Sequence, residues 1–206
     1  MGRENIEIYT DVAVIGGGPS GIAAALSCKM EIEKQNKCAR IIVFELHKRV
    51  GRKLLATGNG TCNISNINAT PQDAKVYYHS NSPEFAVNVL SKFSVSSTLS
   101  YFERIGISTE IEDDGRVYPV SRQASAVLDS LEYQLISKEI EVKTNFEVTK
   151  IEKSDLFQIK GVESTAIEGK SYKDIITVIA KKVIISAGGK AFPSLSSDGS
   201  GYILAK

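Results

Sequence analysis

A glycine-rich turn near the N-terminus constrains the fold of this chain more than any other feature of the sequence. The preceding residues, Val12–Ile15, are continuously apolar, which is typical of a strand in a parallel sheet covered on both faces. Gly16, Gly18 and Gly21 then fit the pattern G-x-G-x-x-G, and a helix is expected over 19–34. In this pattern the first glycine permits a tight turn, the second lets the backbone approach a pyrophosphate, and the third lets the helix pack closely on the strand.

The start of the expected helix is suited to hold phosphate groups. A helix N-terminus offers free N–H groups and a partial positive charge, and a proline is tolerated in the first turn because its missing N–H is not needed there. We therefore place Pro19 and Ser20, together with the three glycines of the pattern, among the candidate cofactor-binding residues.

A second buried-strand pattern, over 41–45, ends in an acid. Glu45 should reach a ribose hydroxyl, as the acidic residue does in dinucleotide-binding folds. It comes 24 residues after Gly21, slightly later than is usual, and the polar stretch 31–37 is expected to lengthen the helix end or the loop. A glycine turn that binds no nucleotide is the alternative interpretation, and this context disfavours it.

Composition excludes several classes of function. A chain of 206 residues can hold one medium domain, or one and a half. A net charge of +1 gives no electrostatic reason to expect nucleic-acid binding, and no apolar segment is long enough to span a bilayer or to serve as a secretion signal. Three cysteines without C-x-x-C spacing indicate reduced thiols, and two histidines make a multi-histidine metal site hard to build. We therefore expect a cytoplasmic protein without metal, membrane or nucleic-acid partners.

The segment 46–63 has the composition of a ligand-facing loop, because it is rich in glycine, small polar residues and cations. It follows directly on the predicted ribose-binding acid. Of its four cations, Lys48 and Arg49 are interpreted as a solvated turn, whereas Arg52 and Lys53 are expected to balance a diphosphate.

The middle of the chain is predicted to be mainly helical. Helices are expected over 84–93 and 98–105, the second capped by Ser96 or Ser97 and stopped by Gly106. Phenylalanines of this region are interpreted as core residues rather than a ligand box. A turn over 113–116 precedes Ser121, the expected N-cap of a helix whose apolar face is Ala124, Val127, Leu128, Leu131 and Leu135.

Short strand patterns follow. The patterns at 146–151, 157–159 and 175–180 indicate an antiparallel β-meander, with turns at 154–155 and 164–171. A separate buried strand is expected over 182–185, before a group of small residues. Ligands collect at such carboxyl strand ends in doubly wound sheets. A second G-x-G-x-x-G is missing, so a separate nicotinamide-binding domain of the same kind is not encoded in these residues.

With these pieces in order, the chain resembles the flavoproteins known as NAD(P)/FAD-dependent oxidoreductases of the aminoacetone oxidase-like or BaiN/RdsA type. The resemblance extends over nearly the whole chain and is carried by four motifs. They are VIGGGPSG at 14–21, GRKLLATGNGTCNISN at 51–66, GRVYP at 115–119 and SAGGKAFP at 186–193.

The resemblance implies an α/β fold: a Rossmann-like FAD-binding domain of the two-dinucleotide-binding (glutathione reductase-like) type. It would combine a parallel sheet with an antiparallel β-meander at about 145–181 and a helical excursion at about 82–138. The activity implied is that of an FAD-dependent oxidoreductase, transferring a hydride to or from a small molecule through a non-covalently bound flavin. NAD(P)H is a candidate electron donor.

The resemblance also assigns residues to the cofactor. Glu45 would bind the adenosine ribose, a main-chain contact from about Val148 would reach the adenine, and the segment 51–63 would follow the pyrophosphate toward the flavin ring. The full set of expected cofactor-binding residues is Gly16, Gly18, Pro19, Ser20, Gly21, Glu45, Leu46, Arg52, Lys53, Leu54, Thr57, Gly58, Asn59, Gly60, Cys62, Asn63, Val148, Ala187, Gly188 and Gly189.

Some features depart from the family or remain open. Family members are roughly twice as long, so we expect 1–206 to be an incomplete FAD-binding domain, lacking an inserted domain and a returning segment. Thr61 stands where many relatives have Arg, and Ser200 where an acid is common. Cys62 is read as a packed small residue rather than a redox thiol. Binding without turnover is the main alternative function, and an NAD-dependent dehydrogenase is disfavoured because the segment 51–63 is flavoprotein-like.

Overall fold

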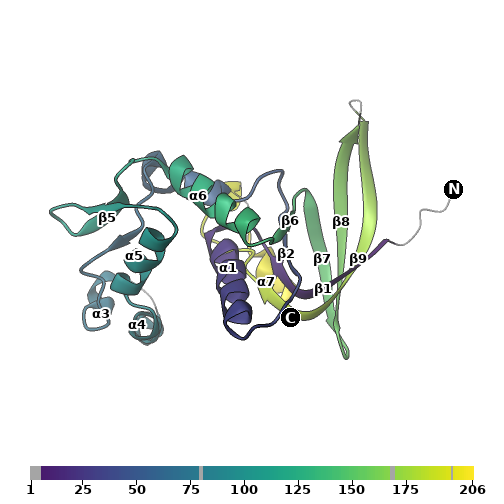
Figure 1. Ribbon diagram of the computed structural model, residues 1–206, viewed down its shortest axis with the longest axis horizontal. Coiled ribbons are helices and arrows are strands. Elements are labelled where there is room, and N and C mark those ends of the chain that lie inside the picture. Colours follow the sequence, from purple (N-terminus) through teal and green to yellow (C-terminus); the bar gives the residue numbers. More distant parts are fainter. Residues whose placement is uncertain (1–5, 79–80, 168–169, 196) are drawn as a thin grey trace. The chain divides into compact units, whose positions relative to one another are not determined.

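The computed structural model describes residues 6–78, 81–167, 170–195 and 197–206. The chain divides into two compact units, which are described separately below. Unit 1 is made of Met1–Lys53 and Tyr133–Lys206, and unit 2 is Leu54–Glu132. Figure 1 labels their helices and strands.

Unit 1 is built on a six-stranded mixed sheet with the order β6-β2-β1-β9-β8-β7. The first four strands in this order are parallel, and β8 and β7 continue the sheet as antiparallel neighbours. The expected parallel sheet and meander are therefore both present, as parts of one sheet. The strands are β1 (Ile6–Ile15), β2 (Ile41–Phe44), β6 (Glu141–Lys143), β7 (Phe146–Lys153), β8 (Phe157–Ile167) and β9 (Lys170–Ile185).

Strand β9 joins the two parts of the sheet, because it is one continuous strand of 16 residues. The prediction of separate strands at 175–180 and 182–185 was wrong, and so was the predicted turn over 164–171, most of which is strand. One edge of β9 pairs antiparallel with β8, and its other edge pairs parallel with β1 from Ile176 to Ile185. This second pairing also extends β1 back to Ile6, six residues before the apolar run that predicted the strand.

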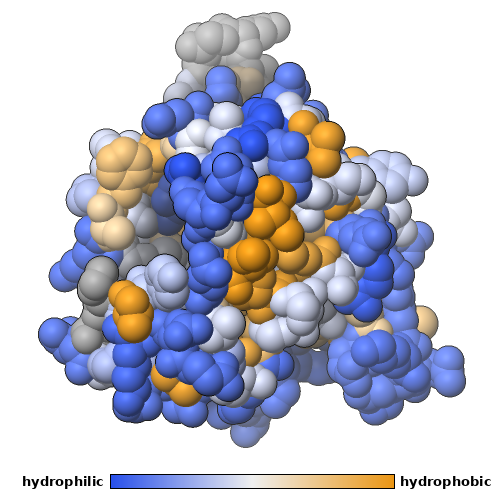
Figure 2. Space-filling view, turned by 90° about the vertical axis from the view of Figure 1, so that its left-hand side faces the viewer, coloured by the Kyte–Doolittle hydropathy of each residue, from blue (hydrophilic) through white to orange (hydrophobic). Residues whose placement is uncertain are grey.

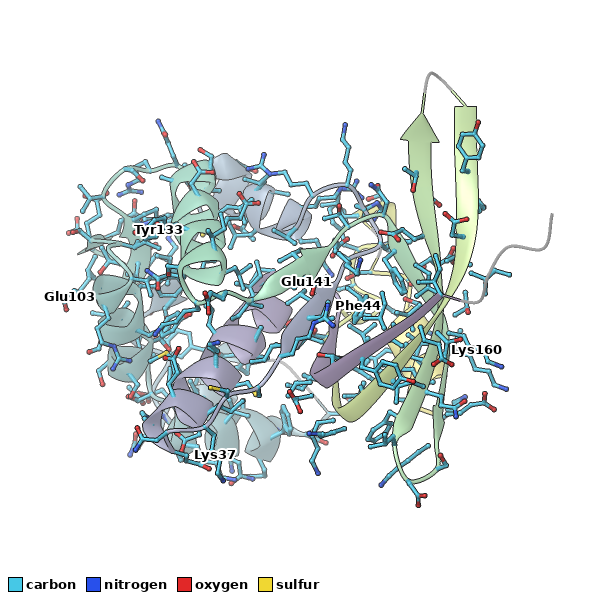
Figure 3. All side chains as sticks on the ribbon, turned by 45° about the vertical axis from the view of Figure 1, so that its right-hand side comes forward. Lys37, Phe44, Glu103, Tyr133, Glu141 and Lys160 are labelled. Atoms are coloured by element: carbon cyan, nitrogen blue, oxygen red, sulfur yellow. The ribbon has the colours of Figure 1, made fainter. Side chains whose placement is uncertain are left out.

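The core of unit 1 lies where the parallel strands meet the meander. Phe44 at the end of β2, labelled in Figure 3, packs against Phe146 at the start of β7 with ring centroids 4.7 Å apart. The N–H of Phe146 donates to the carbonyl of Glu45 over 2.9 Å, which fixes the start of the meander beside the end of β2. Both rings are almost completely buried.

Helix α1 (Pro19–Lys34) begins and ends where the sequence predicts. It packs on the parallel strands through Gly21, Ile22, Ala25 and Leu26, which are all buried. At the other end of the chain, the short helices η2 (Pro193–Leu195) and α7 (Ser200–Leu204) follow β9.

Unit 2 is not only helical. It contains a three-stranded antiparallel sheet of order β3-β5-β4, which the expected helical excursion over 82–138 did not include. The strands were missed because each has at most four residues, too few to show a periodic pattern. The elements of this part of the chain are α2 (Arg52–Leu55), η1 (Thr57–Gly60), β3 (Ser65–Asn66), α3 (Ala74–Tyr77), α4 (Pro83–Lys92), α5 (Val95–Arg104), β4 (Thr109–Ile111) and β5 (Arg116–Pro119).

Helix α6 (Ala124–Ser137) runs from unit 2 into unit 1, and its predicted apolar face is buried as expected. Two predicted caps were wrong. Helix α6 begins three residues after Ser121, and α5 is capped by Ser94, whose hydroxyl accepts from the N–H of Ser97. Gly106 does end α5, with a φ of +87°.

Phe85 of α4 and Phe93, which directly follows this helix, were wrongly predicted to be core. Helix α4 has no buried residue, and Phe85 is 72% exposed, with Val89 and Phe93 on the same stripe also exposed. The i, i+4, i+8 spacing identifies an apolar face but does not say whether another element covers it. Apolar side chains also gather visibly among hydrophilic ones on the face shown in Figure 2.

Replacing Gly161 of β8 by alanine tests the packing of the core. The added Cβ would lie 2.1 Å from Cε1 of Phe146 and 3.0 Å from the carbonyl oxygen of Glu147, so both the ring and the backbone would have to move. We expect Gly161→Ala to lower the free energy of unfolding by about 1–3 kcal/mol, measured by denaturant unfolding. Lys160→Ala, at the exposed neighbouring position labelled in Figure 3, is the control, with an expected change below about 1 kcal/mol. Equal stabilities for the two variants would contradict this packing.

Candidate functional site

Unit 1 contains a cavity of about 160 Å³ at the carboxyl ends of its parallel strands. Its wall brings together residues from the glycine turn, the end of β2, the start of β7 and the segment after β9. The lining residues are Ile15, Gly16, Gly18, Phe44, Glu45, Leu46, His47, Gly51, Arg52, Lys53, Phe146, Glu147, Val148, Ser186, Ala187, Leu195, Asp198, Ser200 and Leu204.

Two glycines of the turn are required by the packing of the protein itself. A Cβ at Gly21 would lie 1.9 Å from the carbonyl oxygen of Gly16, so the helix can approach the turn this closely only without a side chain. Gly16 has a φ of +103°, and a Cβ there would lie 2.7 Å from the carbonyl oxygen of Ser186. These two positions therefore hold β1, α1 and the end of β9 in contact.

Gly18 is different, because nothing in the protein requires a glycine there. Its φ of −74° and ψ of 177° are accessible to any residue, and a Cβ would meet none of the described residues beyond its chain neighbours within 4 Å. Gly18 is the N-cap of α1 and lines the cavity. A glycine at this place leaves the backbone open to a group that comes from outside the protein.

Glu45 is held in place by the backbone on both sides of it. One carboxylate oxygen accepts from the N–H of Gly17 over 2.8 Å, and the other accepts from the N–H of His47 over 2.9 Å. A carboxylate has about four acceptor positions, so each oxygen can accept a further hydrogen bond. The carboxylate therefore ties the glycine turn to the end of β2 and still presents acceptors to the cavity that it lines.

Ser186 closes the opposite side of the turn. Its hydroxyl is placed to donate to two carbonyl oxygens, that of Ile15 at 2.9 Å and that of Gly16 at 3.0 Å. The N–H of Ser186 also donates to the carbonyl of Ile15. These bonds join the ends of β1 and β9 directly below the cavity.

The four cations that follow β2 differ in exposure and in place. Arg52 and Lys53 are half-buried and line the cavity, whereas Lys48 and Arg49 are exposed and do not line it. The ammonium of Lys53 donates to the hydroxyl of Ser197.

Asp198 adds a negative charge to the same wall. The N–H of Ser200 donates to its carboxylate and is the largest of the influences that hold its pKa below the usual range, with the nearby ammonium of Lys53 a smaller one. Among the described residues, no group of three or more His, Cys, Asp or Glu side chains is arranged to hold a metal ion.

Val148, predicted to meet an adenine through its main chain, lines the cavity beside an irregularity of β7. The pairing of β7 with β8 shifts register between Val148 and Lys150. Bulges of this kind occur next to binding sites, where they interrupt the regular pairing of a strand. Leu46 and Ala187 also line the cavity.

The remaining predicted site residues lie elsewhere. Five belong to unit 1 without lining the cavity: Pro19, Ser20, Gly21, Gly188 and Gly189. Seven belong to unit 2: Leu54, Thr57, Gly58, Asn59, Gly60, Cys62 and Asn63.

In unit 2, this loop has an unusual backbone. Gly58, Asn59 and Gly60 are consecutive residues with positive φ, and Cys62 also has a φ of +60°. The hydroxyl of Thr57 donates to the carbonyl of Leu54 over 2.6 Å, at the start of the loop.

Several cavity residues were missed by the sequence reasoning. Gly51 belongs to the motif at 51–66 but was not predicted as a site residue, and its N–H donates to the carbonyl of Gly17 over 2.8 Å. Asp198 and Ser200 also line the wall, although Ser200 was noted only as a departure from the family and Asp198 was not predicted. A strand followed by small and polar residues was the available signal for Asp198, and it did not indicate which side chain would turn inward.

The fold and the cavity together define a Rossmann-type nucleotide-binding protein. A family model described as the HI0933-like protein Rossmann domain matches residues 10–206. The chain belongs to this FAD-binding family, which confirms the family resemblance, the fold class and FAD as the cofactor.

Curated proteins are also similar to this chain over nearly its whole length. The chain is 38% identical over 195 residues to the 3-dehydro-bile acid delta(4,6)-reductase of Clostridium scindens, which covers 95% of this chain and 43% of the relative. It is 25% identical over 202 residues to the ribosomal RNA dihydrouridine synthase of Haemophilus influenzae, covering 96% of this chain and 45% of the relative. The chain thus spans less than half the length of these relatives.

Solved structures show the same fold at low identity. A flavocytochrome c3 fumarate reductase in an open conformation aligns with a TM-score of 0.65 at 16% identity, covering 96% of this chain and 40% of that one. An adenosine-5-phosphosulfate reductase in complex with sulfite aligns with a TM-score of 0.62 at 15% identity, covering 98% and 36%.

The environment of Cys62 predicts that its thiol reacts slowly with thiol reagents. Cys62 is buried, and burial raises the pKa of its thiol, with a contact from Thr57 offsetting part of the effect. Burial also raises the pKa of the Cys28 thiol, whereas Cys38 is exposed. We expect a thiol reagent at neutral pH to modify Cys38 first and Cys62 only on unfolding, as measured by mass spectrometry of the labelled peptides. Rapid labelling of Cys62 in the folded chain would contradict its assignment as a packed residue.

Proposed function

We propose that this chain is the FAD-binding portion of a flavin-dependent oxidoreductase that transfers a hydride to or from a small molecule. Family membership supplies the flavin, and the observation that carries the proposal is the open backbone at Gly18. This glycine borders a cavity, caps a 16-residue helix and faces no protein atom where its side chain would be. A pyrophosphate lying against the backbone is the group that would need this space.

The residues around the cavity have chemical groups suited to the ribose, the diphosphate and the adenine of a dinucleotide. Glu45 would accept hydrogen bonds from ribose hydroxyls while Gly17 and His47 hold its carboxylate still. The N-terminus of α1 and the cation of Arg52 would stabilise the diphosphate charge. Val148 would offer its main chain to the adenine. The cavity is smaller than the pockets that enclose whole cofactors, so unit 1 would hold only part of FAD within it.

The cofactor would carry out the hydride transfer, and the chain would hold the cofactor in position. When bound, FAD supplies hydride transfer, which protein groups orient and tune. The loop 54–63 in unit 2, with its run of positive-φ residues, would approach the flavin, as the family resemblance implies. Cys62 would serve there as a packed residue.

For the substrate we favour a small molecule over RNA. The 38% identical relative is named as a bile acid reductase, whereas the relatives named as ribosomal RNA dihydrouridine synthases are 25% and 23% identical. Unit 2 contains nine acidic and five basic side chains, a balance that repels a polyanion. NAD(P)H from solution is the proposed electron donor.

Binding of FAD without turnover is the second candidate function. It is supported by the share of the relatives that the chain covers, because the relatives' remaining residues can contribute to their activity.

One titration separates the two candidates. The 206-residue chain is titrated with FAD, and the bound flavin is then exposed to NADH or NADPH without oxygen. Binding followed by bleaching of the flavin, and its reoxidation by a 3-dehydro-bile acid whose delta-4,6 double bonds accept the hydride, would support the oxidoreductase. Binding without bleaching would favour the second candidate, and no binding would contradict both.

Alanine at Gly18 provides the sharper test of the site. The added Cβ meets no protein atom, so Gly18→Ala should change the free energy of unfolding by less than about 1 kcal/mol, the scale of an N-cap effect. It should weaken FAD binding by about tenfold or more, because the methyl group occupies the space proposed for the pyrophosphate. Dissociation constants come from flavin fluorescence and stabilities from denaturant unfolding.

Gly21→Ala is the contrasting variant, since its Cβ would collide with the backbone of Gly16. It should lose stability as well as binding. Wild-type FAD affinity in Gly18→Ala would show that the open space at this position is not the pyrophosphate site.

A further inference from the structure

Ser197 is a buried polar residue that the proposed function leaves unexplained. It is only 4% exposed, and among the described residues just one other polar side chain, Thr10, is counted with it as buried. The hydroxyl of Thr10 bonds to neighbouring main-chain carbonyls, which accounts for its burial. The hydroxyl of Ser197 instead accepts from the ammonium of Lys53, a residue 144 positions away in the chain.

The contact between Lys53 and Ser197 is built from three segments of unit 1. Gly188, with a φ of +85°, makes room for it, because a Cβ there would lie 2.5 Å from Nζ of Lys53 and 3.0 Å from Oγ of Ser197. Lys53 lines the cavity, and so does Asp198, next to Ser197. Three segments therefore meet at the ammonium of Lys53 in α2: Gly188 comes from the segment after β9, and Ser197 from the segment before α7.

This arrangement fixes a cation whose side chain is otherwise flexible. A lysine ammonium has three N–H donors on a four-carbon stem, and ordering such a stem costs conformational entropy. One bond to a buried hydroxyl sets the position of the nitrogen and leaves two donors for another acceptor. Asp198 lies on the same wall and offsets part of this positive charge.

We propose that Ser197 is a positioning residue of the cofactor site, which holds the ammonium of Lys53 where it can bind the diphosphate. The inference rests on the proposed function for the identity of the cofactor and on the expectation that Lys53 balances the diphosphate, and it adds the residue that holds this cation in place. Nζ of Lys53 keeps its bond to Ser197 and donates its remaining hydrogens to diphosphate oxygens of the bound nucleotide. Charge-assisted bonds of this kind are the stronger class of hydrogen bond.

The test measures binding of FAD, ADP and adenosine to the 206-residue chain by calorimetry at low and high salt. Lys53→Met should weaken FAD and ADP about tenfold or more and reduce the salt dependence of both, because one charge contact is lost. Adenosine has no phosphate, so its affinity should not change. Lys48→Met removes an exposed cation of the same loop that does not line the cavity, and is the matched control.

Ser197→Ala should weaken ADP by a smaller factor, about threefold to tenfold, and Ser197→Thr, which keeps the hydroxyl, should recover most of the affinity. A purely structural role for Ser197 would instead change the affinities for ADP and adenosine equally. Denaturant unfolding of each variant verifies that it is folded under the conditions of the titrations.

The outcomes distinguish this inference from the proposed function. Wild-type affinity in Lys53→Met, or equal losses in Lys53→Met and Lys48→Met, would overturn the role of Lys53 alone. Binding of ADP but not FAD to the wild-type chain, with the expected variant effects, would contradict the flavin while supporting Lys53. Failure of the wild-type chain to bind either nucleotide would overturn both.

Discussion

The parallel pairing between β1 and β9 is the interaction on which the architecture of unit 1 depends. It brings residues 6–15 beside 176–185 in continuous register and ends with Ile15 opposite Ile185. Because both strands end at the same level, the glycine turn that follows β1 lies against the small residues that follow β9. The hydroxyl of Ser186 then bonds across this junction. The cavity exists because these two strand ends meet.

The glycines of the turn serve two different purposes, which the motif alone does not distinguish. Gly16 and Gly21 are needed because backbone atoms of the protein occupy the positions that side chains would take. Gly18 satisfies no such requirement, and its side-chain position opens into free space. Glycines that the packing requires and a glycine that it does not require thus occur within six residues of sequence.

The wall of the cavity depends on contacts between distant parts of the chain. Phe44 and Phe146 join the parallel strands to the meander, and Lys53 reaches Ser197 across most of the sequence. Glu45 makes contacts of both kinds. Its carboxylate accepts from the glycine turn, and its carbonyl accepts from the start of β7. A small number of side chains near the strand ends therefore holds the sheet of unit 1 together and shapes the cavity.

The sequence by itself determined the features that depend on neighbouring residues. The glycine turn, the bounds of α1, the acid at the end of β2 and the buried face of α6 all follow from local spacing and apolar periodicity. The family motifs added the flavin, because they are specific over the length of the chain.

Only the tertiary structure decided what depends on contacts between distant residues. The continuity of β9 follows from its having two partner strands, and the short strands of unit 2 exist only by pairing with one another. The exposure of Phe85 depends on which elements pack near it, which its own helix does not encode. The same reason explains why Ser197 gave no signal: its role comes from a lysine that is close in space and 144 residues away in sequence.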